Sequence, residues 1–466
     1  MSQRLNFSIE LGKQADNQTS NRSGDLHLTF VVLGCFAGAQ DSGNLLGKPK
    51  VALHRIDQNN FESFFSQLNP SLRIDLAGLN EPLLLTFDSL EDFHPDQLYK
   101  QLSLLDADID RSNQNPSQEI SDQNQPSADN KESNQQTLSR LLGEGSLSSS
   151  PGNSSVSQGK SALIESIVGR LVDDSLQKNG HAQNDLNPEQ PNLHESVAEL
   201  VRTVLHHPDF QALESHWRGL DWLLRNLESD DLDEMYVLNL DYETWDIYSQ
   251  QNLDIVQTDL YKSLQGRFSD RPSSEEKLIL ICDKQITPIS KDIYLLEKLG
   301  QIAESLDALL FAGADNGFIP TEESDTDDLA EWAAFQSTQI ANRVSLVLPR
   351  MLMRLPYGKE YDPVDAFSFE ELGQKWSAAD LLWGCPSYAL AIVLAIYNRS
   401  TNPQDASSLT DCPAFAYRSE SETYLQPCTE HLFKESQLAA ILDLGLVPII
   451  GSRRSNLVKL PWHPQL

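Results

Sequence analysis

Basic residues are scarce in this chain. It carries 35 lysines and arginines against 68 aspartates and glutamates, which gives a formal net charge of −33. No Lys/Arg-rich run occurs in its 466 residues, whereas a nucleic-acid-binding protein needs a cationic surface that displaces counterions. An anionic membrane surface would repel the same charge. The composition therefore argues against nucleic-acid and membrane partners, and the acidity serves either solubility or a basic partner surface.

Long apolar runs and paired cysteines are also missing. The start of the chain, Met1–Glu10, has no apolar core of a signal peptide, and the apolar stretch Ser387–Tyr397 is far shorter than the roughly 20 residues that span a bilayer. The five cysteines are odd in number and scattered: Cys35, Cys282, Cys385, Cys412 and Cys428. Such a set predicts reduced thiols, and these features together predict a cytoplasmic protein.

Patterns that carry catalytic or metal chemistry are absent or incomplete. Gly43–Pro49 resembles a phosphate-binding loop, but its glycine spacing is wrong and proline replaces the hydroxyl residue. No G-x-S-x-G nucleophile elbow occurs. His206 and His207 are adjacent across a predicted helix break, which favours cap and surface positions over a metal site with His216. We therefore expect no catalytic, cofactor-binding or metal-binding residues and no enzyme, the alternative being an enzyme on an inherited scaffold.

The composition changes abruptly at 107–159, where Asn, Gln, Ser, Asp and Pro dominate and aromatic residues are absent. Such a segment cannot bury enough apolar surface to offset the entropy lost on ordering, so we predict a disordered linker. One apolar island interrupts it, at Leu138, Leu141 and Leu142. This island is either a chance cluster or a short recognition helix. The linker divides the chain into domains at 1–106 and 160–466.

The first segment predicts a small, β-rich α+β module. Leu26–Phe36 is rich in β-branched and aromatic residues and is followed by a glycine, which is typical of a buried strand. Shorter strands are predicted at Val51–Ile56, Leu72–Leu76 and Leu83–Phe87. A helix with Phe61, Phe64, Phe65 and Leu68 on one face is expected to stop at Asn69-Pro70. A further helix begins near His94, with proline in its first turn.

The second segment combines helical and strand patterns. Pro208 begins a helix whose apolar residues, including Trp217, recur at three- and four-residue spacing. Leu278–Cys282 and Ala308–Ala312 have the composition of buried strands and flank an amphipathic helix at Ile293–Leu306, which predicts a βαβ element with parallel strands. Further helices are expected at Ser161–Leu176, His194–Leu205 and His431–Leu444, and further strands at Met235–Leu240 and Leu446–Ile450. Helices and loops are expected from Ala312 to Asn398. The predicted fold class is α+β with some α/β character.

Several stretches resemble the two subunits of the type VI secretion contractile sheath. In the first segment, FVVLGCFAG (30–38), HRIDQNNFESFFSQLNPSLRI (54–74) and LTFDSLEDFHPDQL (85–98) are similar to the small subunit (TssB/VipA). In the second, HHPDFQALESHWRGLDWLL (206–224), LPRMLMRLPYG (348–358) and LLWGCPSYALA (381–391) are similar to the large subunit (TssC/VipB) in family order. The chain therefore resembles a fusion of the two subunits, which are separate chains in that family.

The resemblance implies a structural protein that acts through subunit packing. The expected partners are sheath subunits, either further copies or the separate small and large subunits. Inner-tube or baseplate proteins and a AAA+ recycling ATPase are further expected partners, the ATPase at the Leu138–Leu142 island. The family's large subunit continues past the strand at Leu446–Pro448 with a part that exchanges strands between subunits and contacts the inner tube. The absence of that part leaves a non-polymerising cap, initiator, regulator or baseplate binder as the alternative.

Four residues of the shared motifs are candidate interaction residues. Trp217 lies on the apolar seam of its helix, and Arg218 next to it is placed to pair with a carboxylate or a backbone carbonyl. Arg350 and Arg354 are four residues apart, so a helical turn would place them on one face. Maintenance of the fold and contact with a neighbouring subunit both account for these residues.

Overall fold

The computed structural model describes residues 26–38, 51–76, 82–102, 193–227, 233–271, 275–319, 329–373, 376–400, 407–419 and 422–461. The predicted linker at 107–159, its leucine island and the predicted helix at Ser161–Leu176 lie outside these residues.

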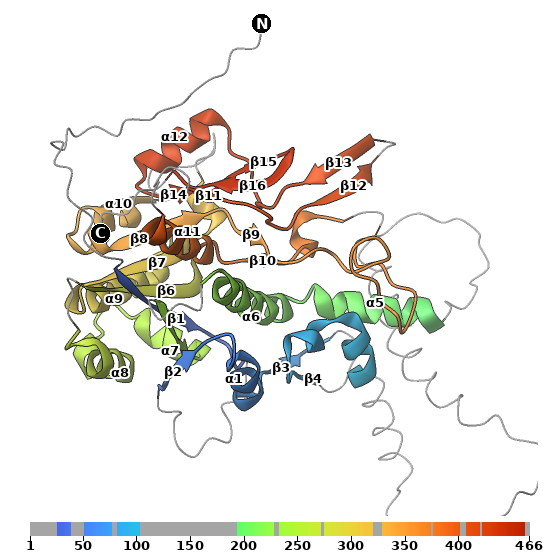
Figure 1. Ribbon diagram of the computed structural model, residues 1–466, viewed down its shortest axis with the longest axis horizontal. Helices are drawn as coiled ribbons and strands as arrows, with labels where there is room; N and C mark the ends of the chain where they lie inside the picture. Colours follow the sequence, from blue (N-terminus) through green and yellow to red (C-terminus); the bar gives the residue numbers. More distant parts are fainter. Residues whose placement is uncertain are drawn as a thin grey trace, which may run out of the picture.

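A seven-stranded sheet forms the centre of the molecule (Figure 1). The strand order is β14-β8-β7-β6-β1-β5-β2, and every neighbouring pair is parallel except β2 with β5. The strands are β1 (His27–Gly34), β2 (Leu53–Ile56), β5 (Asp233–Asn239), β6 (Glu276–Ile286), β7 (Ala308–Ala314), β8 (Val344–Leu348) and β14 (Val447–Pro448). Parallel strands that are covered on both faces have nearly continuous apolar sequences, which explains the composition of β1, β6 and β7.

Strand β1 lies in the middle of this sheet although it belongs to the first segment of the chain. It pairs with β5 from Leu28↔Asp233 onward and with β6 from His27↔Glu276 onward. Its burial pattern has one exposed residue, His27, followed by seven buried ones. The two segments therefore build one sheet together, because β1 and β2 pair with strands of the second segment.

Helices cover both faces of the sheet. On one face, α6 (Pro208–Asn226) and α11 (Ser387–Arg399) share a core with Phe30 and Val32 of β1. The other face is covered by α7 (Tyr242–Tyr248), α8 (Asp259–Phe268), α9 (Ser290–Ser305) and α10 (Ala330–Gln336). Val31 and Leu33 join this second core, because successive residues of a strand point to opposite faces.

The rest of the first segment packs along α6 (Figure 1). It contains α1 (Phe61–Leu68), the antiparallel pair β3 (Ser71–Ile74) and β4 (Leu83–Thr86), the 3₁₀ turn η1 (Leu90–Phe93) and a helix at 95–102. The predicted end of α1 is confirmed: its C-cap Asn69 adopts a left-handed φ of 48°. On the other side of the gap in the described chain, α5 (Leu193–Leu205) leads into α6.

The remaining chain adds small sheets and one helix. They are β9 (Met351–Leu352) with β10 (Trp383–Gly384), β12 (Phe415–Ser419) with β13 (Glu422–Gln426), β11 (Ser408–Leu409) with β16 (Ser455–Lys459) and β15 (Ile450–Ser452), and α12 (Glu435–Asp443). The prediction of only helices and loops up to Asn398 is wrong here. The run VSLVL of β8 is β-branched and too short for a buried helix, which is why it forms a strand.

The predicted fold class is confirmed by the parallel sheet and its helical layers. The βαβ element is also confirmed, as β6, α9 and β7 with β6 and β7 parallel. Ser387–Ala395 of α11 is buried throughout, so this apolar stretch is a core helix. Within the described ranges, no helix combines the length and the apolar character that crossing a membrane requires.

Candidate interface around helix α6

Helix α6 begins where the sequence predicts. His207 is its N-cap and accepts a hydrogen bond at Nδ1 from the backbone N–H of Asp209 at 3.3 Å, and Pro208 occupies the first turn. Buried residues lie on more than one side of the helix. One stripe is apolar, with Leu213, Trp217 and Leu220, and the stripe beside it starts with the fully buried Glu214. The two stripes contact different parts of the chain.

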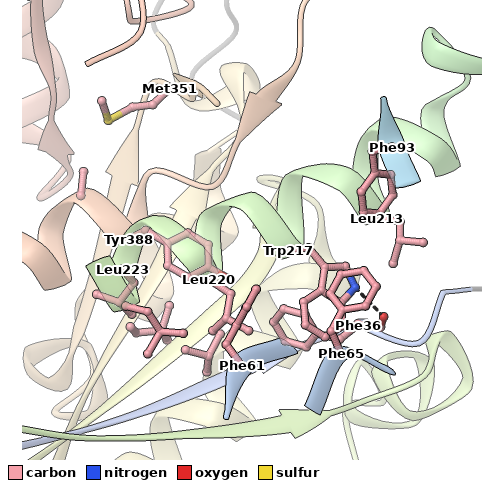
Figure 2. Close-up of a cluster of buried hydrophobic side chains, with 14 of the residues drawn as sticks. Phe36, Phe61, Phe65, Phe93, Leu213, Trp217, Leu220, Leu223, Met351 and Tyr388 are labelled. Carbon is pink, nitrogen blue, oxygen red and sulfur yellow. Dashed lines mark hydrogen bonds between the residues drawn. The ribbon is translucent and has the colours of Figure 1, made fainter. Parts of the chain in front are cut away.

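The apolar stripe contacts the first segment. Trp217 is fully buried, and its indole Nε1–H donates a hydrogen bond to the carbonyl oxygen of Phe36 at 2.9 Å (Figure 2). Its ring centroid lies 5.3 Å from that of Phe36, 5.8 Å from that of Phe61 and 4.0 Å from that of Phe65. The predicted apolar position of Trp217 is confirmed, and the residues that surround it come from the part of the chain before the linker.

Gly219 marks a close contact between α6 and α11. A Cβ atom at this position would lie 2.4 Å from Cε2 of Tyr388, which is closer than real Cβ contacts. The absence of a side chain at residue 219 therefore lets α6 and α11 pack closely together. Tyr388 in turn donates a hydrogen bond to Oδ2 of Asp283 at 2.5 Å, and Nδ1 of His216 lies 2.8 Å from the same oxygen. These contacts tie α6 and α11 to β6.

A buried ionic cluster lies along the second stripe of α6. Arg354 Nε donates to Glu214 at 2.8 Å, and its Nη atoms donate to Glu371 at 2.7 and 2.9 Å. Arg218 Nε donates to Glu214 at 2.8 Å and its Nη2 to the hydroxyl of Tyr357 at 3.0 Å. Two arginines face two glutamates, so the formal charges of the cluster cancel.

Burial and charge act in opposite directions on the pKa values in this cluster. Burial alone would raise the pKa of Glu214, but the charges of Arg354 and Arg218 outweigh it and hold that pKa below its usual range. Burial likewise opposes the charge of Arg354, yet the adjacent glutamates raise its pKa well above the usual value. Burial raises the pKa of Tyr357, so its hydroxyl stays protonated and donates. The cluster is therefore a set of charged pairs.

Arg350 belongs to a different contact. Its guanidinium forms two hydrogen bonds to Glu430, at 2.9 and 2.7 Å. Burial alone would raise the pKa of Glu430, but the bonds and the charge of Arg350 lower it. The predicted helical turn from Arg350 to Arg354 is wrong. Residues 351–352 form strand β9, which pairs with β10 through Trp383↔Leu352 and Gly384↔Met351, and the two arginines bind separate carboxylates.

The acidic partners of the candidate arginines were not predicted from the sequence. Glu214 stands four residues before Arg218, a spacing that favours a helical ion pair, and this signal was available in the sequence. Glu371 and Glu430 are far from their arginines in sequence, so only the fold brings them together. The contacts found for Trp217, Arg218, Arg350 and Arg354 lie within the chain. A contact of these residues with a neighbouring subunit stays a prediction.

The histidines are held by carboxylates. Nδ1 of His206 lies 3.6 Å from Asp380, and burial lowers the pKa of this histidine. Among the described residues, no group of three or more His, Cys, Asp or Glu side chains is placed to hold a metal ion. A cavity of about 310 Å³ lies beside α6, and its lining residues include Leu90 and His94 of the first segment and Trp222, Met351 and Met353 of the second. Its walls therefore come from both segments.

Comparisons with known proteins agree with this two-part construction. The family model described as "EvpB/VC_A0108, tail sheath N-terminal domain" matches residues 191–459, and the model described as "Type VI secretion system, VipA, VC_A0107 or Hcp2" matches residues 5–139. The chain is also similar to the type VI secretion system sheath protein TssC1 of Pseudomonas aeruginosa strain PAO1. The two are 24% identical over 324 residues, which cover 63% of this chain and 64% of TssC1. The chain thus spans less than two thirds of that relative.

The two family matches occur in the order that the motifs predict. The first extends beyond the predicted boundary at 106 and includes Leu138, whereas Leu141 and Leu142 fall between the two matches. The resemblance to a small sheath subunit followed by a large one is confirmed. Since the second match covers more than half of the chain, the protein belongs to the EvpB/VC_A0108 tail sheath family and carries a VipA-type segment before its sheath domain.

Proposed function

We propose that this protein is a structural component of a type VI secretion contractile sheath, or of an assembly associated with the sheath, and that it acts through subunit packing. The observation that carries the proposal is the position of β1. This strand comes from the VipA-type segment and lies between β5 and β6 of the tail sheath domain. One chain therefore contains both the VipA-type segment and the tail sheath domain in a single folded body, whereas the sheath family has them as two subunits.

The contacts around α6 support this proposal. Phe36, Phe61 and Phe65 of the first segment enclose Trp217, which removes their apolar surface from water. Strand β1 of the same chain already occupies the position between β5 and β6. A free small subunit therefore has no edge to pair with at this position, and assembly uses surfaces other than the centre of the sheet.

The proposal includes a cytoplasmic location and no enzymatic activity. Work during contraction would come from rearranged packing between subunits and not from bond chemistry in one subunit. The partners proposed are sheath subunits, with inner-tube and baseplate proteins as further contacts. TssC1 is named as a sheath protein, and its similarity to this chain supports sheath subunits as partners.

Electron microscopy of the purified full-length protein tests the proposal. The protein is imaged in negative stain alone and after mixing with a separately expressed small and large sheath subunit pair. Rings or tubes formed alone, or mixed tubes that contain this chain, are the expected result. Monomers that decorate only one end of a sheath would assign the alternative role of cap or initiator. Monomers that neither polymerise nor bind sheath would refute a sheath role.

We also propose that a AAA+ ATPase binds the leucine island of the chain. Replacing Leu138, Leu141 and Leu142 by aspartate should abolish binding, because the apolar contact is lost. The matched control replaces Ser146, Ser148 and Ser149 by aspartate, which adds the same charge next to the island. Binding is measured by pull-down with the purified ATPase. Equal binding by both triple variants would contradict the assignment of the island.

A further inference from the structure

The cavity beside α6 combines buried and partly exposed apolar walls. Met351 and Tyr357 line it and are 1% and 2% exposed, whereas Leu90, Trp222 and Met353 line it and stay partly exposed. Methionine adapts its shape to what it contacts, and aromatic residues, methionine and arginine are enriched where proteins bind one another. The cavity therefore fits an apolar side chain of a partner protein.

Two arginines that line the cavity keep unused N–H groups. Arg218 donates from Nε to Glu214 and from Nη2 to Tyr357, and Arg225 donates from Nε to Asp221. Within the described ranges, no acceptor is found for Nη1 of Arg218 or for either Nη atom of Arg225. A carboxylate that entered the cavity from outside would accept from them.

Three carboxylates also line the cavity, but they do not cancel this preference. Asp221 is already bonded to Arg225. Asp362 is 54% exposed and lies 3.7 Å from Nε2 of His94, and Glu91 is exposed. Water screens exposed charges, whereas hydrogen bonds of a partly buried arginine contribute more. The cavity therefore favours a partner in which a carboxylate stands beside an apolar side chain.

The same chain presents such a side chain elsewhere on its surface. Val256 is 51% exposed and lies in the 3₁₀ turn η2 (Ile255–Gln257), between the exposed Asp254 and Asp259. Ile255 packs against the core, and Oδ1 of Asp254 accepts the backbone N–H of Val256 at 3.2 Å. These contacts hold the turn, so Val256 is presented in a fixed position with a carboxylate on each side.

The other large apolar side chains that are exposed in the described residues have different neighbours. Leu84 lies opposite an arginine in the β3–β4 register, and Ile289 stands two residues before a lysine. Tyr424 stacks on another tyrosine, with 5.8 Å between the ring centroids. Charge complementarity to the arginines of the cavity therefore favours Val256.

The cavity and Val256 lie on opposite faces of the central sheet. Leu90, Trp222 and Met353 pack against the core that α6 and α11 share, whereas Ile255 packs against the core under α7 to α10. The two surfaces therefore cannot meet within one copy, but two copies can bring them together. Such a contact uses different patches on the two copies, and its repetition gives closed rings or open helical filaments.

We propose that Val256 of one copy enters the cavity beside α6 of a second copy, where Arg218 and Arg225 bind its flanking aspartates. The inference rests on the proposed sheath function and assigns one contact of the packed subunits. Copies with a net charge of −33 repel one another. A contact that sets carboxylates against unused arginine N–H groups offsets part of this repulsion.

Sedimentation velocity on the full-length protein tests the contact. Arg225→Glu and Val256→Ser should each raise the dissociation constant of self-association by roughly tenfold or more. The matched controls, Arg55→Glu and Ile289→Ser, should leave it unchanged. Arg55 is 63% exposed against 72% for Arg225, and Ile289 is 58% exposed against 51% for Val256, so all four changes are at the surface.

The outcomes separate this contact from the sheath function. Wild-type association that Arg225→Glu and Val256→Ser leave intact would overturn the contact and keep the sheath function. A wild-type protein that stays monomeric and binds no sheath would overturn both. Weakening by the controls to the same extent would overturn the contact, because it would show a general effect of charge or polarity.

Cysteine cross-linking between copies gives a positive test. Val256→Cys and Leu90→Cys are prepared as separate proteins, mixed in equal amounts and treated with a mild oxidant. The mixture should form a disulfide-linked dimer with one chain of each kind, whereas Ile289→Cys mixed with Leu90→Cys should not. Absence of the mixed dimer, or equal yields from both mixtures, would overturn the proposal.

Discussion

Two ion pairs of the same chemistry and spacing lie along one stripe of α6, and they differ in burial. Glu214–Arg218 and Asp221–Arg225 are both i,i+4 carboxylate–arginine pairs with a contact of 2.8 Å. Glu214 is fully buried and also accepts a hydrogen bond from Arg354, whereas the side chain of Arg225 is 72% exposed. Water screens the outer pair, while the inner pair has replaced its hydration by hydrogen bonds.

This difference shows that the effect of an ion pair on the free energy of unfolding depends on the environment of the charge that remains when one partner is removed. The inner pair adds little net stability over an apolar replacement of the same shape, but an unpaired charge left in that place is costly. The outer pair leaves both charges in water when it breaks. Substitutions of Arg354 and Arg225 separate these two cases, and substitutions of Trp217 and Arg350 give effects of intermediate size for comparison.

Arg354→Ala should have the largest effect, with a loss of about 3–5 kcal/mol in the free energy of unfolding. The substitution leaves Glu214 and Glu371 buried with one arginine fewer between them. Chemical denaturation at neutral pH measures the loss. Arg354→Met, which keeps the volume but not the charge, should be similarly destabilised. If the free energy of unfolding of either variant fell by less than about 1 kcal/mol, Glu214 and Glu371 would not depend on Arg354 for compensation of their charges.

Trp217→Phe should come second, at roughly 1–3 kcal/mol. The smaller ring leaves a cavity beside Phe65 and leaves the carbonyl of Phe36 without its indole donor. This loss of stability involves no charge and can therefore be compared with the losses at the ion pairs. Denaturation at high and low salt distinguishes the stripes, because the loss at Trp217 should not change with salt. A strong salt dependence would speak against an apolar contact.

Arg350→Ala should cost about 1–2 kcal/mol at neutral pH, less than the inner cluster because Arg350 is partly exposed. The folded-state pKa of Glu430 lies below its unfolded value, so the stabilisation is complete above the unfolded pKa of about 4.3 and is lost as pH falls through the folded pKa. The gap between wild type and variant should therefore narrow below about pH 4. Denaturation between about pH 3 and about pH 7 measures this gap, and a gap that widens in acid would contradict the pairing.

Arg225→Ala should have the smallest effect, within about 0.5 kcal/mol of wild type. It removes the outer pair on the same helix and is the matched control for the inner one. Asp221→Ala should behave alike. A loss as large as that of Arg354→Ala would mean that exposure does not decide the difference between the two pairs.

Much of the fold could be predicted from the sequence, for definite physical reasons. The buried strands β1, β6 and β7 have continuous apolar runs, and α6 has a proline start and a regular apolar seam. The pairing of β1 with β5 and β6 could not be predicted from periodicity, because alternation shows that a strand is buried and not which strand lies beside it. The resemblance to two subunits likewise did not predict that the two segments share one sheet.

The ionic site was less predictable. Arg218 and Arg354 stood out as motif residues, but the pattern of charges did not show which carboxylates they meet. Glu371 follows Arg354 by a loop whose path depends on the packing of Tyr357, and Glu430 reaches Arg350 only through the pairing of neighbouring strands. Strand β9 could not be predicted either, because a strand of two residues shows no periodicity.

The central position of β1 has a consequence for the synthesis of the protein. The ribosome makes β1 first, and its register partner for Leu28 is Asp233, so the strand waits for its neighbours while about 200 residues are added. At typical rates of translation this takes roughly 10–40 s. During that time this strand, in which seven of eight residues are buried in the folded protein, has no place in a sheet and is a target for chaperones. The same covalent link then fixes the two segments at one copy each, whatever the level of expression.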